Sequence, residues 1–493
     1  MKRLVCLLAA IALLAAGSRA QMRVVELPSQ SPLVNLRVVF QAGSVADPAD
    51  KPGLAYLTAM MLARGGSHER TYQQVLDALF PMAASLGVQV DKEMCTFAGA
   101  THSDNLDPYY ALLRDQLLHP GWRGEDLERV RDDAINALRI SLRGNNDEEL
   151  GKEVLEEEIY RGTPYEKYSM GTVSSLQKIS LQDVQEFYRA QYTQANLILG
   201  VAGGYPPAFL ERVKKDFSAL PRGESARAPE IAPAAIERSR AVIVDKDTRS
   251  VAYSIGFPIP VTRASRDYAA LLLAASYFGQ HRSSGGRLYE RMREQRGLNY
   301  GDYAYIEYFP RGMFQLEPSP NLARHAQVFH IWIRPVEPPT AHFALRLALY
   351  ELDQLVRDGI SEEAFERTRD FLGKYANVLT RSKSAELGYA IDSLFYGIPN
   401  YNQYLKTQLA QLTRADVNAA IRRNWRSDRL VIVAVTKNGE EFKRQLAGDA
   451  PSPMVYNSPK PPAIGVEDKV VEKFPLHLSA ENVTVVPADK VFE

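Results

Sequence analysis

An internal repeat constrains the fold of this chain more than any other feature of its sequence. Residues 176–202 align with residues 409–435 at a constant offset of 233 and without a gap. Each copy has a serine or threonine before an amphipathic segment, then a short turn and an apolar run. This order predicts a capped α-helix followed by a buried β-strand. Because matched residues such as Asp183 and Asp416 occupy the same place in both copies, the chain is predicted to be a duplication.

The two halves also begin with the same succession of patterns. An apolar strand pattern at residues 36–41 precedes an apolar helix pattern at residues 53–62, and residues 252–257 precede residues 268–278 in the same way. The sequence therefore predicts an α+β fold built from two homologous domains.

Proline-rich segments mark the expected domain boundaries. We predict one domain at residues 22–220 and its sister at residues 237–447, joined by an exposed linker at residues 221–236 that is rich in proline, alanine, glutamate and arginine. Residues 448–493 are expected to form a proline-rich spacer and a charged C-terminal tail, in which residues 483–486 have a strand pattern.

The N-terminus has the pattern of a secretory signal peptide. Lys2 and Arg3 precede an apolar run, and small residues lead up to Ala20, where cleavage is expected. No later stretch of the sequence is long and apolar enough to span a bilayer. Residues 1–20 therefore predict an exported, periplasmic protein. Cys95 is the cysteine outside the signal, and its apolar surroundings predict a buried thiol.

The composition excludes several classes of partner. The chain has 59 basic and 59 acidic residues, and 45% of its residues are apolar. This is the balance of a globular protein, and it offers no excess positive charge to attract nucleic acid or anionic lipid. We therefore expect neither as a partner.

A predicted helix-to-strand corner contains the two candidate functional residues, Arg293 and Tyr300. Leu288 and Met292 have helical spacing and Gly297 supplies a stop signal, so Arg293 is expected in the last helical turn. The alternating aromatic pattern that begins at Tyr300 predicts a strand. A tight corner of this kind can aim a guanidinium and a phenol at one volume, where they could hold a peptide carbonyl or its oxyanion.

These two residues also have a purely structural interpretation. An arginine in a last helical turn complements the helix dipole, and a tyrosine at the start of a strand is ordinary β composition. The pattern alone leaves both interpretations open.

The segment with Arg293 and Tyr300 resembles the C-terminal half of the insulinase/pitrilysin family of zinc metallopeptidases, whose members carry a basic-rich helix ending in R-x-x-x-x-x-G-Y or a close variant. Residues 71–97 and 171–204 resemble the middle and the end of the family's N-terminal domain, so the resemblance covers nearly the whole chain after the signal. It implies two insulinase-like domains, of the LuxS/processing-peptidase-like metalloenzyme fold, that form a clam-shaped half chamber. It also implies that Arg293 and Tyr300 face a zinc site across that cavity.

The zinc-binding motif of that family is missing from this chain. Members bind zinc through H-x-x-E-H on a helix, in the context G-L-A-H-x-x-E-H-M-L, because the two histidines share one helical face and the glutamate activates the bound water. Here Tyr56, Ala59 and Met60 stand at those positions. The third ligand, a glutamate in a context like L-E-E-I-R, corresponds to Asn136 or Ala137. No metal ligand remains, so the resemblance implies that this chain binds no cofactor.

This combination predicts the non-zinc subunit of an exported, heterodimeric metallopeptidase. The expected partner is a zinc-bearing subunit of the same family, and the expected substrates are peptides or small proteins. The alternative is a non-enzymatic structural or peptide-binding module of the same fold. An independent hydrolase has no metal, base or nucleophile in the sequence to support it.

Overall fold

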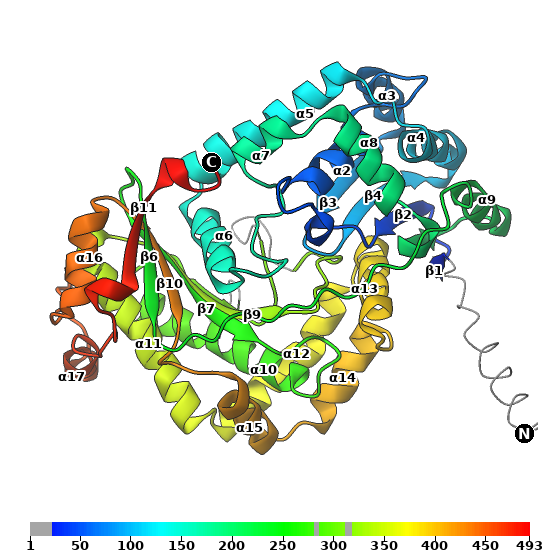
Figure 1. The fold of residues 1–493 in the computed structure, drawn as a ribbon. Helices are drawn as coiled ribbons and strands as arrows, with labels where there is room; N and C mark the ends of the chain where they lie inside the picture. Colours follow the sequence, from blue (N-terminus) through cyan, green and yellow to red (C-terminus); the bar gives the residue numbers. More distant parts are fainter. Residues whose placement is uncertain (1–21, 281–284, 311–317) are drawn as a thin grey trace, which may run out of the picture.

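The chain folds into a mixed α+β structure with two sheets, seen in a computed structural model that describes residues 22–280, 285–310 and 318–493. Each half of the chain contributes its own mixed sheet, and Figure 1 shows the two halves as neighbouring lobes. The signal peptide predicted at residues 1–20 lies outside the described residues.

Five strands form the first sheet and six form the second. The first sheet has the order β1-β5-β2-β4-β3 and the second the order β11-β6-β10-β7-β9-β8. The strands of the first sheet are β1 (Arg23–Pro28), β2 (Leu33–Phe40), β3 (Ser85–Val90), β4 (Cys95–His102) and β5 (Leu197–Gly203). Those of the second are β6 (Arg240–Asp245), β7 (Val251–Ile259), β8 (Asp302–Tyr305), β9 (Gln327–Val336), β10 (Val431–Thr436) and β11 (Val483–Pro487).

Helices surround both sheets. Those of the first half are α2 (Leu54–Arg64), α3 (Tyr72–Leu79), α4 (Leu106–Leu118), α5 (Gly124–Asn136), the π-helix η4 (Ala137–Gly144), α6 (Asp147–Ile159), α7 (Val173–Lys178), α8 (Leu181–Gln191) and α9 (Pro207–Phe217). Those of the second half are α10 (Tyr268–Gly279), the π-helix η6 (Tyr289–Glu294), α11 (Ala341–Asp358), α12 (Glu362–Leu379), α13 (Lys383–Tyr396), α14 (Tyr401–Gln411), α15 (Arg414–Asn424), α16 (Gly439–Gly448) and α17 (Pro462–Val471).

The predicted duplication is confirmed strand by strand. In the first sheet β5 pairs in parallel with β1 and antiparallel with β2, and in the second β10 pairs in the same way with β6 and β7. Both repeat copies form the predicted capped helix and buried strand, α8 with β5 and α15 with β10. Ser180 with Asp183 and Thr413 with Asp416 make equivalent capping boxes at the two helix starts.

The two halves exchange helices across their boundary. Helix α6 of the first half packs on β7 and β10 of the second sheet, and α13 of the second half packs on the first sheet (Figure 1). The packing is close, because a Cβ atom at Gly200 in β5 would lie 2.9 Å from Ile391 Cδ1 of α13. Separating the two lobes would expose the contacts that α6 makes with the second sheet and α13 makes with the first. The two sheets and these two helices therefore form one packed unit.

A buried arginine joins the lobes from the second half. Arg324, whose side chain is 2% exposed, donates to both carboxylate oxygens of Asp91 at 2.7 and 2.5 Å and to Glu156 at 2.9 Å. Asp91 lies in the turn between β3 and β4, and Glu156 lies on α6. The guanidinium also stacks 3.7 Å from the ring centre of Tyr308. This bidentate, charge-assisted cluster fixes three separate segments at one point.

The C-terminal tail is ordered against both lobes. The predicted strand at residues 483–486 is β11, which adds to the second sheet in parallel with β6. The last residue, Glu493, then reaches the first half, where Arg143 donates to its carboxylate at 2.8 Å and the amide of Ser174 donates to its backbone carbonyl at 2.7 Å. The tail therefore spans the boundary between the lobes.

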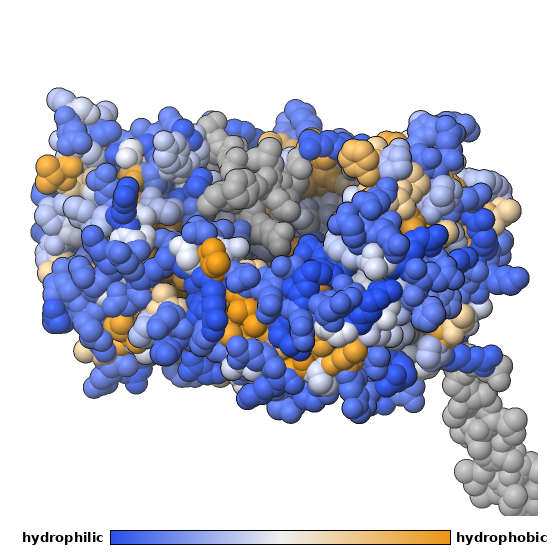
Figure 2. All heavy atoms as spheres, turned by 90° about the horizontal axis from the view of Figure 1, so that it is seen from above, coloured by the Kyte–Doolittle hydropathy of each residue, from blue (hydrophilic) through white to orange (hydrophobic). Residues whose placement is uncertain are grey.

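The face of the molecule drawn in Figure 2 is mostly hydrophilic, with apolar residues in small patches. Among the described residues, no helix has the length and apolar character needed to cross a membrane. The prediction for Cys95 is confirmed, because it is a free thiol in the core, where burial raises its pKa to about 12.

Candidate functional site

The candidate site begins at a π-helical turn. Where an α-helix was predicted, η6 has π geometry, with the amide of Gln295 donating to the carbonyl of Glu290 at 3.0 Å. The predicted apolar face is confirmed, since Leu288 and Met292 are fully buried. Gly297 follows with a φ of 69°, a conformation that favours glycine. Short π turns occur often at functional sites, where they redirect side chains.

The structure brings Arg293 and Tyr300 together. Arg293 Nη1 donates to the backbone carbonyl of Tyr300 at 3.3 Å, and its guanidinium carbon lies 5.8 Å from the centre of the Tyr300 ring. The same guanidinium lies 4.8 Å from the ring centre of Tyr289 and donates to its hydroxyl. Tyr300 is 77% exposed. The corner thus presents a guanidinium and a phenol side by side, with the phenol open to solvent.

The strand after the corner is shorter than predicted. β8 begins at Asp302, two residues after Tyr300, because the intervening chain makes a side-chain turn. The amide of Gly301 donates to the side-chain oxygen of Asn299 at 3.1 Å, and the Asn299 amide donates to Asp302 at 2.7 Å. This turn holds Tyr300 outside the ladder and leaves its side chain exposed.

Asp302 anchors this turn from inside the protein. The residue has no solvent exposure, and burial raises the pKa of its carboxyl to about 8. The neutral acid is therefore the favoured form at neutral pH, since a buried carboxylate must give up its hydration. Asp302 falls within the aromatic segment predicted as a strand, where no local pattern in the sequence indicates its burial.

Replacing Asp302 with asparagine is expected to stabilise the protein at alkaline pH. The pKa of the Asp302 carboxyl is about 8 in the folded protein, against an ordinary value of 3.8. Between these two values the folded protein holds a proton that the unfolded chain releases. The stability contributed by this proton is therefore complete below about pH 4 and is lost as the pH rises to about 8. Asparagine has no titratable proton, so Asp302→Asn should be more stable than the parent at pH 8 by on the order of 5 kcal/mol, about 1.4 kcal/mol for each unit of the pKa shift. Urea unfolding from pH 4 to 9 measures the difference, with Asp370→Asn at an exposed position of α12 as control. A difference that does not grow with pH would contradict this expectation.

The positions expected for zinc ligands are occupied by packing residues. Ala59 is 0% and Met60 8% exposed, and both contribute to the core from α2. Tyr56 is half-buried on the same helix, whereas Asn136 is exposed at the end of α5 and Ala137 begins η4. Within residues 22–280, 285–310 and 318–493, no group of three or more histidine, cysteine, aspartate or glutamate side chains could hold a metal ion.

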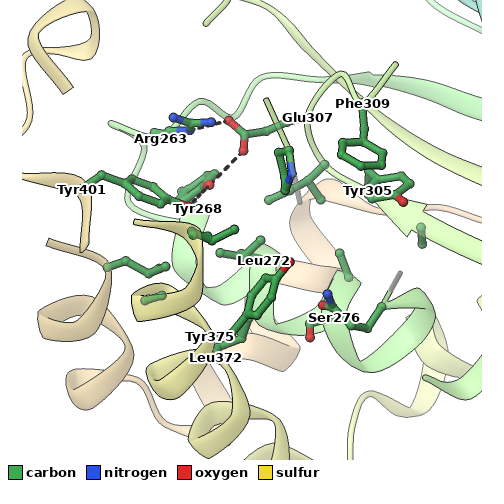
Figure 3. Close-up of a pocket in the computed structure, with 18 of the residues that line it drawn as sticks. Arg263, Tyr268, Leu272, Ser276, Tyr305, Glu307, Phe309, Leu372, Tyr375 and Tyr401 are labelled. Atoms are coloured by element: carbon green, nitrogen blue, oxygen red, sulfur yellow. Dashed lines mark hydrogen bonds and ion pairs between the residues drawn. The ribbon is translucent and has the colours of Figure 1, made fainter. Parts of the chain in front are cut away.

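A cavity of about 80 Å³ lies in the second lobe, near the C-terminal end of β8, whereas Arg293 and Tyr300 precede the N-terminal end of that strand. Figure 3 shows the Glu307 carboxylate with Arg263 and Tyr268 turned toward it, and Tyr375 across the cavity from them. Glu307 accepts from Arg263 Nε at 2.9 Å and from the Tyr268 hydroxyl at 3.0 Å, while Arg263 also donates to Asp392 at 3.0 Å. These charges compensate one another, so the cavity favours neutral, apolar groups.

The cavity was not predicted from the sequence. Its walls come from α10, the segment around β8, α12 and α14, with Leu272, Ala304, Ile306, Phe309, Leu372 and Leu405 among the apolar lining residues. No local spacing in the sequence indicates that these separate segments meet.

Two family models together match most of the chain. Residues 23–173 match the model of the insulinase peptidases, Peptidase family M16, and residues 178–372 match the model described as the Peptidase M16 inactive domain. The chain belongs to the M16 (insulinase) family. The resemblance stated from the sequence is thereby confirmed, as is its fold of two homologous α+β domains.

The relatives include one protein that is named a non-peptidase homolog. The non-peptidase homolog YmxG of Helicobacter pylori is 22% identical over 419 residues, covering 83% of this chain and 90% of that protein. Among solved structures, a peptidase M16 inactive domain from Pseudomonas fluorescens has a TM-score of 0.75 and 22% identity, covering 85% of this chain and 96% of that one. The periplasmic protease PqqL of Escherichia coli has a TM-score of 0.67 and 14% identity, covering 94% of this chain and 50% of PqqL.

Proposed function

We propose that this M16 protein is the non-zinc subunit of an exported, periplasmic heterodimeric metallopeptidase. The observation that carries the proposal is a contrast between two sites. Ala59 and Met60 are packed into the core where the family binds zinc, whereas Arg293 and Tyr300 stand together with the phenol exposed. An exposed aromatic ring contributes little to folding, so its place beside a guanidinium is better explained by a ligand than by stability.

The proposed role of the pair is to hold the peptide group that the partner's zinc site cleaves. Arg293 and Tyr300 offer N–H and O–H donors, and a peptide carbonyl gains negative charge on oxygen during hydrolysis. The Arg293 guanidinium is already oriented in the corner by its hydrogen bonds to the Tyr300 carbonyl and the Tyr289 hydroxyl, so this donor needs little reorganisation. The zinc, the activated water and the general base belong to the partner subunit in this proposal.

The likeness to PqqL supports a second subunit. This chain aligns with half of PqqL, so the fold leaves room in that longer chain for another unit of similar length. In the proposal, a zinc-bearing partner supplies the other half of the chamber. The same likeness, to a protein described as periplasmic, supports the proposed location.

The second candidate function is a non-enzymatic structural or peptide-binding module. The name of the Helicobacter pylori relative favours it, because that protein is called a non-peptidase homolog. The apolar cavity beside Glu307 would suit a peptide side chain in either role. The two functions differ in whether a zinc-bearing partner needs this chain for turnover.

The purified chain is expected to bind no stoichiometric zinc and to cleave no peptide by itself. Tyr56, Ala59 and Met60 provide no thiolate, imidazole or carboxylate to hold the metal. Elemental analysis and a quenched fluorescent peptide library test both points. One tightly held zinc per chain, or cleavage by the chain alone, would sink the proposal.

Mixing with an exported relative that carries H-x-x-E-H is expected to give a heterodimer with peptidase activity above that of the relative alone. Size-exclusion chromatography over a range of concentrations follows assembly, and the peptide library follows turnover. A relative whose motif glutamate is replaced by glutamine serves as control, because the pair should then be inactive. A heterodimer without a gain in activity would favour the structural module.

A further inference from the structure

The C-terminal tail reaches the candidate site through buried ion pairs. Arg296, three residues after Arg293, has a side chain with 0% exposure. Its Nε donates to Asp468 at 2.9 Å and its Nη2 donates to Glu467 at 2.8 Å. Both carboxylates lie on α17, in the tail, more than 170 residues further along the chain.

A second arginine of the π turn is held by the same helix. Arg291 pairs with Glu467 and donates to Glu351 of α11 at 2.6 Å. Glu351 is 2% exposed and also accepts from Arg287 at 2.7 Å. The turn is therefore held from two sides, by α11 and by α17, while Arg293 between them faces Tyr289 and Tyr300.

The tail itself is fixed at this position. Asp468 is buried and accepts a hydrogen bond from the Tyr456 hydroxyl at 2.7 Å, within the tail. At the base of the tail, the fully buried Arg346 of α11 donates to the carbonyl of Phe474 at 2.9 Å and to Asp449 at 2.6 Å. Helix α17 thus has its own attachment to the second lobe and can serve as a support for the turn.

We propose that the C-terminal tail is a positioning element for the Arg293–Tyr300 corner, with Asp468 and Glu467 as the positioning residues. The inference rests on the proposed function for what the corner does, but the positioning itself is a property of this chain alone. The π turn spans six residues, so it has few internal hydrogen bonds to fix its orientation. Buried charge pairs are directional and costly to misplace, so they select one orientation of the turn.

The first test is hydrogen exchange in the full chain. Asp468→Asn keeps the shape of the side chain but removes the charge that Arg296 requires. Amides of residues 287–301 are expected to exchange about tenfold faster or more, because a lost charge-assisted hydrogen bond corresponds to at least that factor. Amides of β6 and β10, in the same lobe, should keep their parent rates. Glu481→Gln, an exposed carboxylate of the same tail, is the matched control and should change neither segment.

Glu467→Gln is the second variant, because Glu467 is more exposed than Asp468 and its loss endangers folding less. It should loosen the same segment to a smaller extent. Parent rates at residues 287–301 in a folded variant would overturn the inference. Faster exchange throughout the second lobe would overturn it as well, since the tail would then act on general stability.

Activity of the reconstituted pair provides a separate measurement. Asp468→Asn should lower kcat at least about tenfold and change KM little, because a displaced donor is missed most in the transition state. A fall confined to KM would argue against positioning. If the pair shows no activity with the parent chain, the proposed function fails while the exchange experiment still decides the positioning of the corner.

Discussion

Tyr300→Phe is expected to lower kcat of the reconstituted peptidase pair about a hundredfold, the typical cost of removing one oxyanion donor. The substitution removes a hydroxyl and keeps the ring. Because Tyr300 is 77% exposed, fold and assembly should be unaffected. KM should change little, since the donor acts more strongly in the transition state than in the ground state. Initial rates over a range of peptide concentrations separate the two constants.

Arg293→Lys should be nearly as harmful, although it keeps the positive charge. A lysine ammonium cannot reproduce the planar fork that lies between Tyr289 and the Tyr300 carbonyl. Tyr404→Phe and Arg357→Lys, on α14 and α11, are the matched controls and should leave turnover at the parent level. Parent values of kcat for both Tyr300→Phe and Arg293→Lys would refute the role of the corner and favour the structural interpretation of these residues.

Much of the fold could be predicted because it depends on local patterns that occur twice. Ser180 and Thr413 cap equivalent helices, and the apolar runs after them become the buried strands β5 and β10. A short, continuous apolar run of this kind is most stable as a strand that is buried within a sheet. The repeat therefore carried information on both secondary structure and topology.

The contacts between the halves could not be predicted in this way. The ion pair between Arg324 and Asp91 joins residues 233 positions apart, and each is an ordinary charged residue in its local sequence. The packing of α6 on the second sheet has no signature either, because an amphipathic helix does not indicate which sheet will cover its apolar face. Such information exists only in the folded chain.

The candidate site was predicted in part. The seven-residue spacing of Arg293 and Tyr300 indicated a shared corner, and the structure places them in contact. The spacing did not reveal the π turn, the buried Asp302 or the support from α17. Asp302 lies in an alternating aromatic strand where its pKa depends on burial, and burial follows from tertiary packing rather than from sequence neighbours.

Arg324→Met is expected to reduce the free energy of unfolding by about 3 to 5 kcal/mol, the usual cost of removing one partner from a buried ion pair. Methionine fills part of the space of the side chain, so the main loss is electrostatic. Asp91 and Glu156 would remain buried, each deprived of the guanidinium that compensates its charge. Urea unfolding at neutral pH measures the change. Arg357→Met, at an exposed position of α11, is the control and should change stability by less than about 0.5 kcal/mol.

A triple variant distinguishes two explanations of the stability that Arg324→Met is expected to lose. If unpaired charge causes the loss, Arg324→Met combined with Asp91→Asn and Glu156→Gln should recover much of the stability, because no uncompensated carboxylate remains. If the loss came from the missing contact with the Tyr308 ring, the triple variant would be as unstable as the single one. Recovery would show that the unpaired carboxylates of Asp91 and Glu156, rather than the lost contact with the Tyr308 ring, destabilise the single variant.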